Sequence, residues 1–211
     1  MSKKIAVIDY GMGNLRSVAK AVEHVAGNAE VLVTDQPSIV ASADHIVFPG
    51  QGAAAECMSA LHRHELETVV REAAKEKPFL GICMGMQVLM SHSAENGGVN
   101  CLGLFEGDVL PFAEKINDPS LKIPHMGWNE VLQAPHPLWS GIENGSRFYF
   151  VHSYYVQPKD ETLTLGQCEY GIPFTAALGR ENVFAIQSHP EKSADVGLQL
   201  LKNFVEWDGQ A

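Results

Sequence analysis

Apolar positions change their spacing repeatedly along the first half of the chain. Four short apolar runs predict buried strands, at residues 3–10, 29–34, 45–48 and 79–82. Between these runs, apolar residues recur at helical intervals and predict helices over residues 15–25 and 56–77. Strands that alternate with helices form βαβ units, so we expect a mostly parallel central sheet flanked by helices on both faces.

The second half of the chain has a different pattern, with strand candidates separated by turns and little helix. The candidates are residues 128–133, 147–156, 162–171 and 183–188, and a final helix is expected over residues 194–207. Strands joined by short turns pair antiparallel, so we expect them to extend the sheet. No linker divides the chain, and we therefore predict a single-domain α/β fold, a three-layer sandwich over residues 1–211.

Composition and charge narrow the classes of protein that fit. The 211 residues are 45% hydrophobic and 19% charged, which is typical of a globular protein with a buried core. A formal net charge of −10 argues against nucleic acid or an anionic membrane surface as a partner. No apolar stretch approaches the roughly 20 residues that span a bilayer, and the N-terminal run is too short for a signal peptide. The four cysteines lack zinc-site or disulfide-framework spacing, so we expect no metal and a reduced, cytoplasmic protein.

The stretch GICMG places Cys83 between two glycines where an apolar strand becomes helical. A sharp strand-to-helix turn strains the corner residue, and small residues two positions to either side prevent clashes. The corner side chain then stands above the carboxyl edge of the sheet, at a helix N-terminus that favours a thiolate. This pattern is typical of a nucleophile. The simpler interpretation, a small buried apolar residue, remains about equally good on this stretch alone.

The stretch QSHPEKS follows a predicted strand and contains His189 and Glu191, two positions apart. On extended backbone such side chains point the same way, and Pro190 holds the backbone out of a helix. Glu191 can then orient the imidazole while the other ring nitrogen faces a nucleophile. A solvated surface turn is the alternative, but the presence of the Cys83 stretch in the same domain favours a Cys–His–Glu triad.

The stretch FPGQGA, which contains Gly50, Gln51 and Gly52, follows another predicted strand. A glycine-rich loop at a strand end exposes backbone N–H groups, which can stabilise a developing oxyanion. On its own this stretch is better explained as a tight turn between a strand and a helix.

Together the three stretches resemble the class I, triad-type glutamine amidotransferases. That family has an oxyanion-loop PGxG, a GxCxG elbow and a C-terminal HPE in this order, and the resemblance covers nearly the whole chain. It implies that Cys83 attacks the side-chain amide of L-glutamine and that His189 carries the thiol proton to the departing ammonia. It further implies an oxyanion hole of backbone N–H groups near Gln51, Gly52 and Met84, and no cofactor.

The same resemblance implies a role for two further residues. Gln87 and Glu95 stand at the offsets after the cysteine where the family holds the carboxylate and amino group of the substrate glutamine. Ser188 is a departure, because phenylalanine commonly precedes the histidine in this family. The departure leaves the predicted triad unchanged and concerns the packing around it.

Three other stretches resemble one branch of the family, the glutaminase subunits of imidazole glycerol phosphate synthases: DYGMGNLRSV, HMGWN and YFVHSYYV. The resemblance implies a heterodimer with a separate (β/α)8-barrel cyclase subunit. That subunit would use the ammonia to make imidazole glycerol phosphate and aminoimidazole carboxamide ribotide in histidine biosynthesis. Five residues would lie at the interface or near the oxyanion loop: Asn14, Met126, Trp128, Asn129 and Lys192. Core or turn positions are the simpler interpretation of these five.

Three other functions stay open at this point. An amidotransferase subunit of another synthase, such as anthranilate synthase, would share every predicted catalytic residue and differ in its partner. A cysteine hydrolase of similar fold would turn over without any partner. In a non-catalytic binding protein, Cys83 would be inert.

Overall fold

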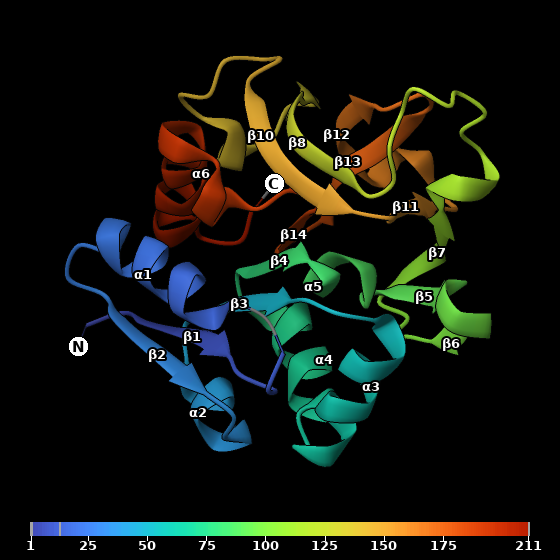
Figure 1. The fold of residues 1–211 in the computed structure, drawn as a ribbon. Helices are drawn as coiled ribbons and strands as arrows, with labels where there is room; N and C mark the ends of the chain where they lie inside the picture. Colours follow the sequence, from blue (N-terminus) through green and yellow to red (C-terminus); the bar gives the residue numbers. More distant parts are fainter. Residues whose placement is uncertain (1, 13, 211) are drawn as a thin grey trace.

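Strands and helices alternate through the first half of the computed structural model, which describes residues 2–12 and 14–210 (Figure 1). The helices are α1 (Leu15–Val25), α2 (Pro37–Ser42), α3 (Ala54–Arg63), α4 (Glu67–Glu76), α5 (Met84–Gln87) and α6 (Ala194–Glu206). Short 3-10 helices are η1 (Glu95–Gly97), η2 (Phe112–Glu114), η3 (Pro137–Trp139), η4 (Glu161–Leu163) and η5 (Pro190–Lys192). The strands of the first half are β1 (Lys4–Ile8), β2 (Glu30–Thr34), β3 (His45–Gly50), β4 (Phe79–Cys83), β5 (Met90–Ser93) and β6 (Val99–Asn100).

The second half of the chain is mostly strand. These strands are β7 (Phe105–Pro111), β8 (His125–Glu130), β9 (Leu132–Gln133), β10 (Arg147–His152), β11 (Tyr154–Pro158), β12 (Thr164–Glu169), β13 (Pro173–Arg180) and β14 (Val183–Ile186). In the main sheet the order is β2-β1-β3-β4-β14-β13-β11-β7-β5-β6, with β12 paired to β13 and β9 to β12. The first five strands of that order are parallel, and β13, β11 and β7 continue the sheet antiparallel. The predicted α/β class, with its antiparallel extension, is confirmed.

Helices cover both faces of the parallel part of the sheet, as the alternation of side chains along β1 requires. Ile5 and Val7 face a core that includes residues of α1 and α6, such as Phe204. Ala6 and Ile8 face the opposite core, formed with α2, α3 and α4. Figure 1 shows these two groups of helices on opposite sides of the strands. No helix within residues 2–12 and 14–210 is long and apolar enough to cross a membrane.

The single helix predicted over residues 56–77 is wrong, because α3 and α4 are separated by a turn. Glu65 adopts a left-handed conformation with φ of 56°, and the Leu66 N–H donates to the Leu61 carbonyl at 2.9 Å. This hydrogen bond spans the last turn of α3 and joins two fully buried leucines, which identifies the end of the helix as a Schellman motif. Glycine usually occupies the left-handed position, so a glutamate there hides the end of the helix from sequence analysis.

The strand predicted over residues 147–156 is two strands in two different sheets. β10 pairs with β8 in a separate two-stranded sheet, whereas β11 belongs to the main sheet, and Ser153 separates them. Sequence analysis did not identify α2, β5, β6, β7 or β13. β5 reads MSHS and β7 reads FEGDVLP, so neither has the apolar run or regular alternation that marks a strand.

A buried histidine pair holds the small sheet against the main sheet. His125 Nδ1 lies 2.9 Å from His152 Nε2, and both imidazoles pack among aromatic rings that include Phe112 and Phe174. His152 Nδ1 also lies 2.8 Å from the Tyr154 carbonyl oxygen. Burial lowers the pKa of His125 to about 4. Burial likewise lowers the pKa of His152 to about 3, with the neighbouring histidines acting in the same direction.

We expect Gly85→Ala to destabilise the fold severely. A Cβ at this position would lie 1.8 Å from the Phe48 carbonyl oxygen, which is backbone and cannot give way as a side chain end would. The free energy of unfolding should fall by about 3 kcal/mol or more, measured by urea denaturation. Gly145→Ala is the matched control, because its φ is 83° but open space surrounds it. In that control the free energy of unfolding should fall by only about 1–2 kcal/mol, which is the cost of a left-handed conformation for a residue that has a Cβ. Equal losses in the two variants would contradict the steric explanation.

We expect the His152 imidazole to make folding sensitive to acid. The pKa of His152 in the folded chain, about 3, lies below the usual histidine value near 6.5. As the pH falls, the imidazole is therefore protonated in the unfolded chain before it is protonated in the folded chain. Stability is therefore lost as the pH falls below about 6.5, by roughly 2 kcal/mol between pH 7 and pH 5. In urea denaturation, the free energy of unfolding of His152→Gln should fall by about 2 kcal/mol less than that of the wild type between pH 7 and pH 5. The same substitution at exposed His24 should keep the wild-type slope. Parallel curves for all three proteins would contradict the assignment.

Candidate active site

Cys83 ends β4 in a strained conformation, with φ of 55° and ψ of −112°. A non-glycine residue adopts such a positive φ only where the surrounding structure enforces it. Gly81 and Gly85 flank the corner, and Gly85 in α5 packs directly on the backbone of Phe48 in β3. The sharp strand-to-helix turn predicted from the glycine spacing is therefore present, and its backbone strain falls on this cysteine.

His189 and Glu191 follow β14, which pairs in parallel with β4. His189 Nδ1 lies 2.8 Å from Glu191 Oε1, and the two side chains are only 3% and 1% exposed. Burial lowers the pKa of His189, but Cys83 and Glu191 favour the imidazolium and outweigh burial, so the pKa is raised. His189 Nε2 has no hydrogen-bond partner among the described residues, which leaves it free toward the cysteine.

The backbone of this segment is held to the small sheet. The His189 N–H donates to the Tyr149 carbonyl at 2.8 Å, and the Ser193 hydroxyl donates to the His189 carbonyl at 2.6 Å. The same hydroxyl accepts from the Tyr149 N–H at 2.9 Å. β10 thus positions the histidine directly.

A cavity of about 420 Å³ brings most of the predicted site residues together. Its lining consists of Gln51, Gly52, Cys83, Met84, Gln87, Glu95, Val151, His152, Ser153, Tyr154, His189 and Lys192. Of the predicted catalytic and substrate-binding residues, Gly50 and Glu191 are absent from this lining. Gly50 pairs with Cys83 in the register of β3 and β4, and Glu191 lies behind His189.

Two side chains that sequence analysis missed hold the glycine-rich loop after β3. The buried Tyr10 hydroxyl donates to the Pro49 carbonyl at 2.8 Å. The Cys57 thiol donates to the Gln51 carbonyl at 3.4 Å. A Cβ at Gly50 would lie 2.4 Å from the Tyr10 hydroxyl oxygen, so this glycine is required for the close approach. Two of the loop's carbonyls are thus directed toward the protein interior.

Gln87, the last residue of α5, and Glu95, the first residue of η1, both line the cavity. Gln87 Nε2 donates to the Tyr154 carbonyl at 3.2 Å and to Gln187 Oε1 at 2.9 Å, while Gln87 Oε1 is buried and has no protein partner. Glu95 Oε2 accepts from the Ala54 N–H at 2.7 Å, at the start of α3. Both residues therefore offer carboxyl or amide oxygen, rather than N–H groups, to a ligand.

Gln187 is a further residue of the site that sequence analysis missed. Its Nε2 lies 3.7 Å from the Cys83 sulfur, and the side chain is fully buried. The predicted extended backbone across Pro190 is wrong, because Pro190 begins the short helix η5, which contains Glu191. The spacing argument therefore gives no signal for Gln187, which lies beyond the end of β14.

The five residues predicted for a partner interface lie in four different places. Met126 and Trp128 project from one face of β8 and are 62% and 47% exposed. Asn129 lies on the other face, where its amide donates to the Glu169 carbonyl at 2.8 Å and lies 3.3 Å from His125 Nε2. Lys192 lines the cavity, and exposed Asn14 precedes α1.

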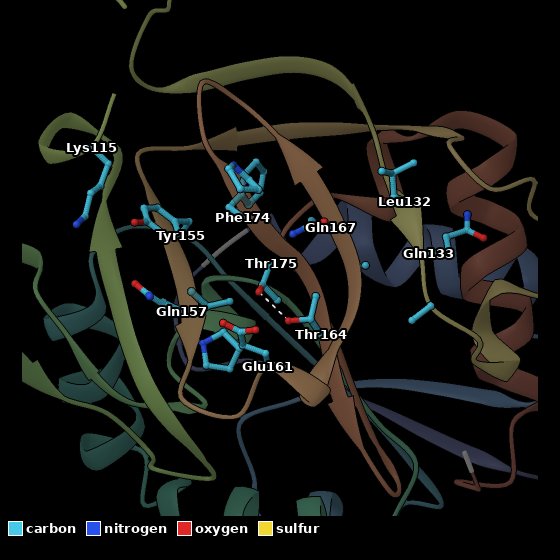
Figure 2. Close-up of a pocket in the computed structure, with 15 residues that line it drawn as sticks. Lys115, Leu132, Gln133, Tyr155, Gln157, Glu161, Thr164, Gln167, Phe174 and Thr175 are labelled. Atoms are coloured by element: carbon cyan, nitrogen blue, oxygen red, sulfur yellow. Dashed lines mark hydrogen bonds between the residues drawn. The ribbon is translucent and has the colours of Figure 1, made fainter. Parts of the chain in front are cut away.

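A second, larger cavity of about 670 Å³ shares no residue with the one around Cys83. It lies over β9, β11, β12 and β13, and Figure 2 shows Tyr155, Phe174 and the hydrogen-bonded Thr164 and Thr175 along it. No strained residue or unpaired buried polar atom of the described chain lies in it. The strained Cys83 and the unpaired buried atoms of Gln87 and His189 instead line the smaller cavity. In residues 2–12 and 14–210, no cluster of three or more His, Cys, Asp or Glu could hold a metal ion.

The chain is similar to known proteins over nearly its whole length. The family model for class-I glutamine amidotransferases matches residues 6–207. A protein named imidazole glycerol phosphate synthase subunit HisH, from Dechloromonas aromatica, is 64% identical over 96% of this chain and 96% of its own length. A protein of the same name from Hydrogenovibrio crunogenus is 57% identical over 99% of this chain and 98% of its own length.

Solved structures of low sequence identity share the fold. The crystal structure of a glutamine amidotransferase has a TM-score of 0.71 at 16% identity, over 96% of this chain and 97% of its own. The glutaminase domain of Trypanosoma brucei CTPS has a TM-score of 0.62 at 16% identity, over 98% and 95%. The family match and the two close relatives go further than fold, and they show that the chain belongs to the class-I glutamine amidotransferases and, among them, to the HisH subunits of imidazole glycerol phosphate synthase.

Proposed function

We propose that Cys83, His189 and Glu191 are the catalytic triad of this enzyme, which hydrolyses L-glutamine to glutamate and ammonia. The observation that carries the proposal is the cavity that Cys83 and His189 both line, with Glu191 buried against the imidazole at 2.8 Å. The raised pKa of His189 supports a histidine that holds the thiol proton before the reaction begins.

The proposed reaction has two halves. The Cys83 sulfur forms a bond to the amide carbon, and the carbonyl electrons move onto oxygen, next to Gln51, Gly52 and Met84. His189 then donates its proton to the nitrogen as the carbon–nitrogen bond breaks, which releases ammonia and leaves a γ-glutamyl thioester. In the second half, His189 takes a proton from water, the water oxygen attacks the thioester, and the carbon–sulfur bond breaks to give glutamate.

We further propose that Gln87 and Glu95 bind the amino-acid end of the substrate. Gln87 Nε2 is occupied by two protein acceptors, whereas its Oε1 has no protein partner. This oxygen can accept a hydrogen bond from the substrate α-ammonium, and Glu95 can add negative charge beside it. The orientation of Gln87 favours contact with the ammonium rather than with the carboxylate.

The proposed partner is a separate cyclase subunit, a (β/α)8 barrel that forms a heterodimer with this chain and receives its ammonia. Both close relatives are named as subunits of imidazole glycerol phosphate synthase, which supports a partner chain. Exposed Met126 and Trp128, on a strand whose other side carries His125 of the buried histidine pair, support β8 as the docking element. The acceptor reaction would yield imidazole glycerol phosphate and aminoimidazole carboxamide ribotide.

We propose that residues 1–211 act as one amidotransferase domain in the cytoplasm. Cys57, Cys83, Cys101 and Cys168 are all free thiols, which supports a reducing compartment.

The resemblance to this branch of the family implies that glutamine hydrolysis is coupled to a nucleotide, a phosphoribulosyl-formimino-carboxamide ribotide, bound on the cyclase. We therefore expect glutamate formation to be negligible for the protein alone, and to rise steeply when the cyclase and this nucleotide ligand are both added. Cys83→Ala should lower the rate of that complete mixture at least about 1,000-fold, because the nucleophile is lost. The control is Cys168→Ala, which removes another buried thiol, outside the cavity, and should keep the rate within about twofold. Full activity in Cys83→Ala would refute the triad, and a rate insensitive to the cyclase would refute the partner.

We expect Trp128→Ala to weaken binding of the cyclase by about tenfold to a hundredfold, measured by calorimetry. Large aromatic side chains that become buried on association contribute most to interface affinity. Val33→Ala is the matched control, because Val33 is also 47% exposed but lies in β2, at the far edge of the main sheet. Equal affinities for Trp128→Ala and Val33→Ala would show that the cyclase docks elsewhere.

A further inference from the structure

Two buried amides connect a backbone carbonyl of β11 to the Cys83 sulfur. Tyr154 supplies the carbonyl, and Gln87 Nε2 donates to it at 3.2 Å. Gln87 Nε2 also donates to Gln187 Oε1 at 2.9 Å, and Gln187 Nε2 lies 3.7 Å from the sulfur. Both glutamines are at most 2% exposed, and Cys83 is 7% exposed. The chain of contacts therefore lies in a region with little solvent.

The direction of this chain is set by the Tyr154 carbonyl. An amide nitrogen carries two hydrogens, and Gln87 Nε2 has one acceptor for each of them. A flipped Gln87 would place its oxygen against the Tyr154 carbonyl, where neither group could donate. Gln187 must in turn present its oxygen to Gln87, which leaves its N–H groups facing the sulfur. The backbone of Gln187 is fixed as well, because its N–H donates to the Ala176 carbonyl at 2.8 Å.

A sulfur anion in such surroundings needs hydrogen-bond donors. α5 after Cys83 is a single turn of four residues, so the effect of a long helix dipole is absent here. An N–H donated by a neutral side chain stabilises a thiolate more than a thiol, because hydrogen bonds to charged groups are stronger. Unlike His189, a glutamine can do so without exchanging a proton.

We propose that Gln187 is a further catalytic residue, which donates a hydrogen bond to the Cys83 thiolate, and that Gln87 is a positioning residue that orients it. This inference rests on the proposed role of Cys83 as nucleophile. It assigns Gln87 a second task beside substrate binding, because one side-chain amide serves both the sulfur and the ligand. The thioester sulfur carries no charge, so the hydrogen bond from Gln187 matters before acylation and again as the thiolate departs.

The test is the rate at which 2-chloroacetamide alkylates Cys83 in the full-length chain between pH 5 and pH 10, located by mass spectrometry. The reagent is neutral, and the assay needs neither glutamine nor the cyclase. Burial raises the pKa of the other thiols, to about 12 for Cys57 and Cys168 and about 11 for Cys101, so they react slowly in this range. The ionisable groups around the sulfur are unchanged in every variant below: Tyr10, Cys57, Glu95, His152, His189, Glu191 and Lys192.

We expect Gln187→Met, which preserves length but removes the donor, to slow alkylation about tenfold at pH 7. The midpoint of the pH–rate profile should move up by about one pH unit, with no loss in the limiting rate at high pH. Gln87→Met should produce a shift in the same direction, and the double variant should shift no further than Gln187→Met alone. Ser188→Ala is the matched control, because Ser188 is equally buried and adjacent, and its hydroxyl has no partner. Its profile should coincide with that of the wild type.

An unshifted midpoint in Gln187→Met, with Cys83 still alkylated, would overturn the inference. A uniform fall in rate at every pH would also overturn it, since that is the signature of a merely structural role. If Gln187→Met does not fold by circular dichroism, an unshifted Gln87→Met overturns the inference on its own. The proposed function fails separately, through glutamate formation that survives Cys83→Ala in the complete mixture with the cyclase.

Discussion

The close approach of α5 to β3 is the contact on which the site depends. The Phe48 carbonyl occupies the place where a Cβ of residue 85 would lie, so only glycine allows the chain to turn so tightly after the nucleophile. The backbone of Cys83 is strained as a result, and strain of this kind costs of order 1–3 kcal/mol. Pairing of β4 with β3 on one side and β14 on the other holds the strained residue in place.

The same pairing explains why the site assembles at one edge of the sheet. β3, β4 and β14 are parallel, so the loops that follow them leave from the same edge. The loop with Gln51 and Gly52, the corner at Cys83 and the segment with His189 therefore meet without long connections. Three stretches that lie far apart in the sequence form one cavity because three adjacent strands end together.

The parts of the structure that could be predicted from sequence are those with short-range causes. Apolar runs and helical spacing indicated the βαβ half, and glycines at fixed offsets marked the corner at Cys83. The end of α3 was missed because Glu65 takes a conformation that its residue type does not suggest. β5 and β7 were missed because their partners in the sheet, rather than their own residues, make them strands.

The predicted site was incomplete for a related reason. The glutamines that meet near the sulfur are 100 residues apart, and Tyr10 is 39 residues from the carbonyl it binds. No local pattern marks a side chain whose partner is brought to it only by the fold. Short motifs identified the groups proposed to react, whereas the groups that hold them became visible only in three dimensions.

The passage of the chain from β10 to β11 has a mechanical consequence. One residue, Ser153, separates a strand of the small sheet from a strand of the main sheet, and residues on both sides of it line the cavity. Ser153 joins the two sheets covalently, so the small sheet cannot move without displacing Val151 and His152 of the cavity wall. The exposed side chains of Met126 and Trp128, on β8, and the cavity-lining Val151 and His152, on β10, thus belong to one two-stranded sheet.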